Sequence, residues 1–247
     1  TTRQSGDVQV PEWHEERAQK RTSGLPAAVD TVIEHLRYRL YPNDRNAVFM
    51  GVDDFLFQET ETVEILSHVK YGSVRCAVTR TDQDALKGET AHTLVIPTTL
   101  KEIGPYAFAY MQNLKRVVIP SSVRTIKRGA FAGCTNLSSI TIEPGVRLIE
   151  GTSFAGTGIT SITIPNTVKD LQTYVFEDCK KLKTVKLPDG IKKIGECLFM
   201  GCESLTSVVV PPTVTEIGER AYYDCKSLSS VTLPEGLVKI CDGAFSD

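Results

Sequence analysis

The sequence predicts an α/β repeat solenoid, because three columns of apolar residues recur together in its second half. An aromatic residue and two aliphatic residues return at successive gaps of 23, 23, 22, 23, 23 and 23 residues. Since all three columns share the same short step, they belong to one repeating structural unit. The aromatic column consists of Phe108, Phe131, Phe154, Phe176, Phe199, Tyr222 and Phe245.

Each unit predicts a short strand, a second extended segment and a turn. The strand is marked by alternation, as at Val208 and Val210, which buries one face. Proline follows because it cannot donate a hydrogen bond to a sheet, so it ends the strand. A Val-x-x-Ile-Gly segment then forms the second extended piece. The following Ala-Phe pair is expected to place its ring in the core from a short helical or 3₁₀ turn.

One unit departs from the pattern in two places. The run from Phe131 to Leu137 corresponds to a run from Phe154 to Ile159 that is one residue shorter. Gly158 lies at this deletion, where a tighter turn requires unusual backbone angles. Glu143 stands where the other units have proline, and Pro144 follows it without changing the register.

The unit Leu-x-x-Ile-x-Ile-Pro-x-x-Val-x-x-Ile-Gly-x-x-Ala-Phe-x-x-Cys resembles the BspA-like leucine-rich repeat. The resemblance covers residues 92–247, about two thirds of the chain. It implies an array of about seven coils whose stacking buries a continuous core. It also implies a binding or surface-attachment module, since the family has no single activity.

The first 91 residues lack the period and are expected to form two segments: an extended polar arm over residues 1–24 and a small α/β capping region over residues 25–91. The capping region would shield the first coil of the solenoid, which spans residues 92–247. Within it we expect helices over 26–41 and 63–69, an apolar run of undetermined type over 46–52, a strand over 73–80 that pairs with residues 94–96, and a polar loop over 81–91.

Four cysteines occupy one column, three residues after the aromatic residue: Cys134, Cys179, Cys202 and Cys225. Equivalent residues of stacked coils lie about 4.8 Å apart with parallel side chains. A disulfide needs Cβ atoms about 3.8 Å apart and turned toward each other, and zinc needs converging ligands. We therefore expect a ladder of buried thiols, with no metal and no cofactor.

The composition is that of an ordinary globular chain: 247 residues, 41% hydrophobic, 23% charged, with a net charge of −2. No run of about 18 apolar residues predicts a membrane span. The four histidines have no ligand spacing, and no nucleophile elbow or phosphate loop is present. The sequence therefore predicts a protein that is not an enzyme.

A column of cations is the candidate binding site. Lys101, Arg124, Arg147, Lys169 and Lys192 occupy one repeat position on five successive coils. Such a line of like charge indicates an acidic protein partner, with RNA ranked second because no aromatic residues interleave it. Ordinary solvated surface is the interpretation favoured over this binding role, since the next column supplies Glu102, Asp170 and Glu216.

The leading functional hypothesis is a non-enzymatic protein-interaction scaffold, held as a subunit in a larger intracellular or organellar assembly. The sequence stops two residues after Phe245, so we expect a partner, a second copy or further chain to cover the last coil. The alternative is a surface-exposed adhesion protein that binds host or matrix proteins. Weak RNA binding through the basic column is the third hypothesis.

Overall fold

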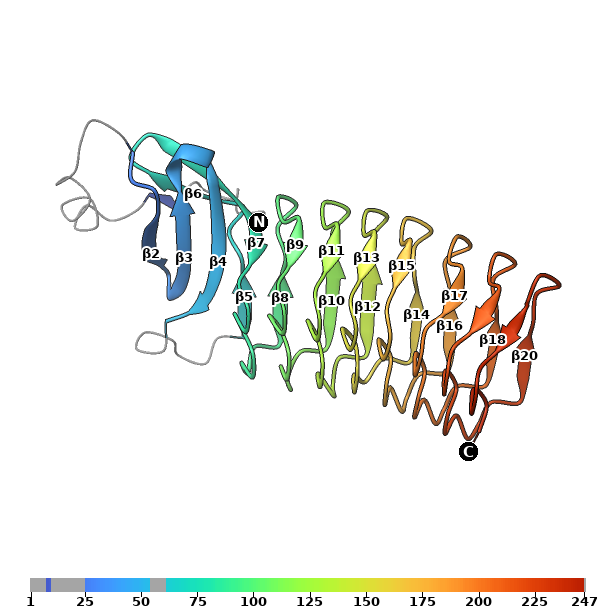
Figure 1. The fold of residues 1–247 in the computed structure, drawn as a ribbon. Helices are drawn as coiled ribbons and strands as arrows, with labels where there is room; N and C mark the ends of the chain where they lie inside the picture. Colours follow the sequence, from blue (N-terminus) through green and yellow to red (C-terminus); the bar gives the residue numbers. More distant parts are fainter. Residues whose placement is uncertain (1–7, 10–24, 54–60, 247) are drawn as a thin grey trace.

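The computed structural model describes residues 8–9, 25–53 and 61–246. These residues form an elongated row of stacked coils that begins at a broader sheet near the N-terminus (Figure 1). The predicted solenoid of about seven turns is confirmed. The predicted α/β class is wrong, because the described residues are nearly all β and their one helical element is the 3₁₀ turn η1 (Pro42–Asp44).

Each coil contributes one strand to each of two faces, and the strands that pair between coils are parallel. The first strands are β8 (Thr93–Val95), β10 (Arg116–Ile119), β12 (Ser139–Ile142), β14 (Ser161–Thr163), β16 (Thr184–Lys186), β18 (Ser207–Val209) and β20 (Ser230–Thr232). The second strands are β9 (Glu102–Ile103), β11 (Thr125–Ile126), β13 (Leu148–Ile149), β15 (Asp170–Leu171), β17 (Lys193–Ile194), β19 (Glu216–Ile217) and β21 (Lys239–Ile240).

The turn that carries the aromatic residue is not the expected helical turn. Tyr106 and Tyr110 both have positive φ, at 51° and 58°, and the same two positions recur with positive φ along the array. A left-handed residue cannot continue a right-handed helix, so the chain makes consecutive turns instead. The Phe108 amide donates to the carbonyl of Ala130 on the next coil at 2.9 Å.

The aromatic column forms the spine of the core. From Phe131 to Phe245, consecutive ring centroids lie 5.1–5.8 Å apart in stacked pairs. The first pair, Phe108 and Phe131, is tilted by 42°. Phe176 is fully buried between its neighbours. Stacked rings of this kind tie each coil to the next, as the repeat predicts.

The segment predicted as a helix over residues 26–41 is a β-hairpin of β2 (Val29–Ile33) and β3 (Leu36–Tyr41). The two residues between these strands, Glu34 and His35, have positive φ, as a tight hairpin turn requires. In β3 every second residue is buried, including Tyr38, whose ring packs on Phe49 with centroids 5.5 Å apart. This period of two outweighs the apparent helical spacing.

The segment predicted as a second helix over residues 63–69 is also extended. It contains β5 (Thr62–Glu64) and the start of β6 (His68–Tyr71). The apolar run over 46–52 is β4 (Asn46–Val52). The backbone of β1 (Val8–Gln9), from the predicted arm, pairs with β6 in parallel; the rest of residues 1–24 lies outside the described residues.

The strand predicted over residues 73–80 is confirmed as β7 (Val74–Thr81), but its predicted partner is wrong. β7 pairs with β4, β6 and β9, whereas β8 pairs with β5 and β10. The reason is that β5 already supplies the strand stacked beside β8. Stacking thus begins before residue 92, and the sheet runs without interruption from the N-terminal hairpin to β15.

Residues 81–91, expected as a polar loop, contain buried Leu86. The Leu86 amide donates to the Ala107 carbonyl of the next coil at 2.6 Å. The amides of the aromatic residues make the equivalent hydrogen bond in later coils. The division of the chain at residues 24/25 and 91/92 stays a prediction, as does the capping role of the N-terminal region.

Candidate functional site

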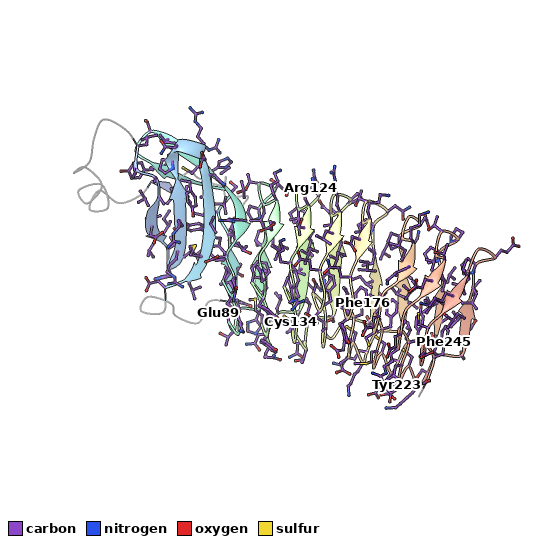
Figure 2. The ribbon with its side chains drawn as sticks, viewed as in Figure 1. Glu89, Arg124, Cys134, Phe176, Tyr223 and Phe245 are labelled. Atoms are coloured by element: carbon purple, nitrogen blue, oxygen red, sulfur yellow. The ribbon has the colours of Figure 1, made fainter. Side chains whose placement is uncertain are left out.

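The five predicted cations lie in one line along the solenoid. Each is exposed and follows the loop that leads from a first strand to a second strand, and Figure 2 labels Arg124 at this loop edge. The backbone sets the spacing of these residues. The Arg124 amide donates to the Lys101 carbonyl at 2.7 Å, and the Arg147 amide donates to the Arg124 carbonyl at 2.9 Å. We call Lys101, Arg124, Arg147, Lys169 and Lys192 the cationic column.

The cationic column is not neutralised by carboxylates. Within the described part of the chain, none of its five side chains forms an ion pair. Arg124 donates to the carbonyls of Ser121 and Gly145 at 2.6 and 3.2 Å, and Lys169 donates to Asn166 at 3.1 Å. Like charges one coil apart repel by about 1 kcal/mol even in bulk water.

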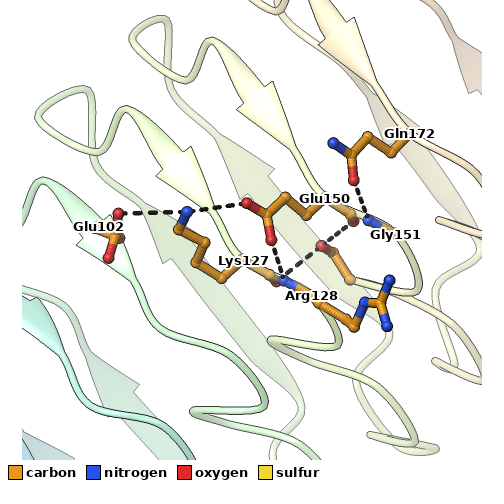
Figure 3. A network of polar contacts seen from close by, with 7 residues as sticks. Glu102, Lys127, Arg128, Glu150, Gly151 and Gln172 are labelled. Carbon is orange, nitrogen blue, oxygen red and sulfur yellow. Dashed lines mark hydrogen bonds and ion pairs between the residues drawn. The ribbon is translucent and has the colours of Figure 1, made fainter.

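Most acidic residues in the next column form ion pairs with lysines that do not belong to the cationic column. Glu102 lies 3.8 Å from Lys127, whose ammonium group also donates to Glu150 at 3.0 Å (Figure 3). The hydrogen bond from Lys127 to Glu150, helped by the charge of Glu102, raises the pKa of this lysine. The second Glu150 oxygen accepts from the Arg128 amide at 3.1 Å. These ion pairs and hydrogen bonds lie beside the cationic column, and none of them includes a side chain of the column.

Glu216 forms similar ion pairs, because its carboxylate lies 3.8 Å from the ammonium group of Lys193 and 3.9 Å from that of Lys239. Of the three acids expected to balance the column, only Asp170 has no such lysine partner among the residues that are described. The neighbouring charges are therefore mostly balanced by ion pairs, as on an ordinary solvated surface, whereas the charges of the cationic column are not.

The sheet on the first face is interrupted beside the column. β12 ends one four-stranded sheet and β14 begins another, although the two strands belong to consecutive coils. The short step of the repeat lies between them, although the same two coils stay paired on the second face through β13 and β15. A groove of about 820 Å³ opens at this place, lined by Ile142, Pro144, Arg147, Thr163, Ile164, Pro165, Asn166, Thr167, Lys169 and Lys186.

The second face is interrupted one coil later, where the sheet ends at β15 and another begins at β17. A groove of about 430 Å³ lies there between residues 169–173 and 191–195, and Lys169, Lys192 and Lys193 line it. These two interruptions lie along the cationic column, and a third separates β16 from β18 on the first face. Sequence reasoning did not place Lys186 or Lys193 in the site; the shortened repeat was the signal that could have pointed to them.

The thiol ladder is the other predicted feature. Cys134, Cys179, Cys202 and Cys225 are buried, as predicted. Each thiol donates to the carbonyl of the aromatic residue on the preceding coil, at 3.1–3.2 Å. Burial raises the pKa of Cys134 and of Cys179 to about 12. Such thiols are poor nucleophiles, and the ladder is structural.

No other cluster in the described residues offers obvious chemistry. They contain no group of three or more His, Cys, Asp and Glu side chains that could hold a metal ion. His35, His68 and His92 lie apart, and His14 lies outside the described residues. In the same part of the chain, no helix is long and apolar enough to cross a membrane. At the last coil, Val238 and Phe245 are 83% and 41% exposed.

A family model described as a BspA type leucine-rich repeat region matches residues 68–183 and 147–247, in 6 copies. The chain belongs to this BspA-type leucine-rich repeat family. The match begins within β6, in agreement with the early start of the coil stacking. Leucine-rich repeats of this type generally serve protein–protein interaction, and the family and fold are typically non-enzymatic.

Solved structures of leucine-rich repeat proteins share the fold. A leucine-rich repeat protein from Bacteroides ovatus is 29% identical, with a TM-score of 0.77, over 83% of this chain and 54% of that one. The chain thus spans about half the length of that protein. A T. pallidum leucine-rich repeat protein is 23% identical, with a TM-score of 0.71, over 81% of this chain and 91% of that one.

The pneumococcal vaccine antigen PcpA shows the same fold at 15% identity, with a TM-score of 0.56, over 84% of this chain and 71% of that one. No curated protein matches the chain.

Proposed function

We propose that this protein is a scaffold subunit of a larger intracellular or organellar assembly, and that its cationic column contacts an acidic surface of a protein partner. One observation carries the proposal: five exposed cations follow one another on successive coils without ion pairs in the described structure, while the nearby Lys127 and Lys193 are paired. An acidic partner would relieve the repulsion among them.

A protein partner is favoured over RNA by the composition of the column. Its repeat position continues with Thr215 and Val238, and no aromatic residue lies within it to stack on bases. The net charge of the chain is only −2, so attraction through the column must be local and salt-sensitive. These features suit a defined contact better than general binding to polyanions.

Reversing the charge of two column residues tests this proposal. The double variant Arg147→Glu and Lys169→Glu is expected to slow association with the natively co-purified partner by about tenfold or more, since steering charges act mainly on the association rate. Its free energy of unfolding should change by less than about 1 kcal/mol, because both side chains are exposed. Surface-based binding kinetics and urea denaturation measure the two quantities.

Lys115→Glu is the matched control, because Lys115 is exposed and lies outside the column. An association rate that changes neither in the double variant nor at raised salt would contradict the proposal and identify the column as ordinary solvated surface. A partner of extracellular host or matrix origin would favour the adhesion hypothesis, and a complex dispersed by ribonuclease would favour RNA.

A further inference from the structure

The groove between the loops at residues 142–147 and 163–169 is the most distinctive irregularity in the array. Two departures from the repeat flank it: the short step between Phe154 and Phe176, whose deletion lies just before β14, and the displacement of the loop proline to Pro144. The Glu143 carboxylate, which replaces that proline, accepts from the Ser121 amide at 2.8 Å. It therefore lies bound to the preceding coil and does not line the groove.

The residues that line the groove combine an apolar wall with cations. Ile142, Ile164, Pro144 and Pro165 supply the apolar part, and no carboxylate belongs to the lining. Arg147 and Lys186 line the groove from two different strand-to-loop regions, and neither side chain has a polar partner in the described structure. Lys169 contributes a third cation, and in the described structure its ammonium group donates a hydrogen bond only to the Asn166 carbonyl.

Of two acids close to this lining, Asp189 is engaged by Asn166, whereas Asp170, next to Lys169, has no lysine partner among the described residues. The Asn166 amide donates to Asp189 at 2.8 Å, and the Asp189 amide donates back to the Asn166 side-chain oxygen at 3.1 Å. The Thr167 hydroxyl accepts from the Gly145 amide, which ties the two loops together at 3.1 Å. The two loops are therefore tied together, and the lining of the groove carries three cations and no carboxylate.

We propose that this groove binds an extended acidic segment of a protein partner, with carboxylates at Arg147, Lys169 and Lys186 and an aliphatic side chain against Pro144 and Pro165. The inference rests on the proposed function and names the part of the partner that the groove recognises. Three coils cover about 10 Å, which an extended peptide crosses with about three residues. Charge complementarity favours Asp and Glu, and the aliphatic wall offers nothing on which a base can stack.

Fluorescence anisotropy with the full chain tests the proposal. The probe is fluorescein-Gly-Asp-Glu-Leu-Asp-Glu-Gly-amide. One control peptide has Asn and Gln in place of the acids, and another has Gly in place of Leu. The acidic-aliphatic probe should bind, and each control peptide should bind about tenfold or more weakly, because each loses one half of the recognition.

Two variants separate this inference from the proposed function. Lys186→Glu changes the groove but not the cationic column, and should weaken probe binding about tenfold or more. Lys101→Glu changes the column at a distance from the groove; it should leave probe binding within about twofold while it slows association with the whole partner. Lys115→Glu should affect neither, and denaturation midpoints verify that all three variants fold.

Equal binding of the three peptides, or probe binding that survives Lys186→Glu, would overturn the groove assignment while the column proposal stands. So would an oligouridylate that binds in the groove when the acidic probe does not. Loss of whole-partner association only with Lys186→Glu, and not with Lys101→Glu, would instead count against the column.

Discussion

Replacing Phe176 with alanine is expected to lower the free energy of unfolding by about 3–5 kcal/mol. Phe176 is fully buried and stacks between Phe154 and Phe199, with centroid distances of 5.8 and 5.4 Å. Removing this ring opens a cavity in the middle of the array, and coils on both sides lose their contact. Urea denaturation followed by circular dichroism measures the change.

Ser161→Ala is the matched control, because Ser161 is an exposed residue of β14 in the same coil. Its free energy of unfolding should change by less than about 0.5 kcal/mol. Similar losses for the two variants would contradict the assigned repeat register.

Raising the pH above 9 is expected to unfold the protein through its buried thiols. An unperturbed cysteine has a pKa of 9.0, whereas burial raises the pKa of Cys134 and Cys179 to about 12. Between these values the unfolded chain releases protons that the folded chain keeps, so the free energy of unfolding falls as pH rises. The stability is fully present below pH 9.0 and is lost through pH 12.

The loss should approach about 1.4 kcal/mol per pH unit for each such thiol within this window. Cys202, whose pKa burial also raises, adds to it in the same direction. Far-ultraviolet circular dichroism and thiolate absorbance of a Cys241→Ser variant, which lacks the partly exposed cysteine, together check the prediction. Thiolate should appear only as the fold is lost, and near its ordinary pKa in urea. Thiolate formation from the intact fold of this variant well below pH 12 would contradict the buried ladder.

The repeating part of the fold was predictable because each element is specified many times over. Strand alternation, the proline that ends most first strands and the aromatic column all recur in register, so an ambiguous pattern in one coil is resolved by the others. The N-terminal hairpin has no such redundancy. There, residues such as Val29, Val32 and Leu36 fit a helical face, and only the alternation through Tyr38 and Leu40 indicates the strand.

The candidate site was predictable in its line of charge but not in its shape. Repeat position alone places Lys101 through Lys192 on one edge. Whether the nearby acids neutralise that line depends on side-chain directions, and Glu102 and Glu216 lie against other lysines. The groove was not predicted either, because a one-residue deletion shows that the coils must adjust but not which strands will separate.

Lysine-reactive cross-linking of the natively purified complex, followed by mass spectrometry, tests the central claim most directly. The account predicts that cross-links to the partner concentrate at Lys101, Lys169, Lys186 and Lys192, beside partner segments rich in Asp and Glu. Lys115, Lys180 and Lys226 are exposed lysines outside this edge and serve as internal references. Cross-links that favour those three residues, or partner segments without acidic character, would contradict the account.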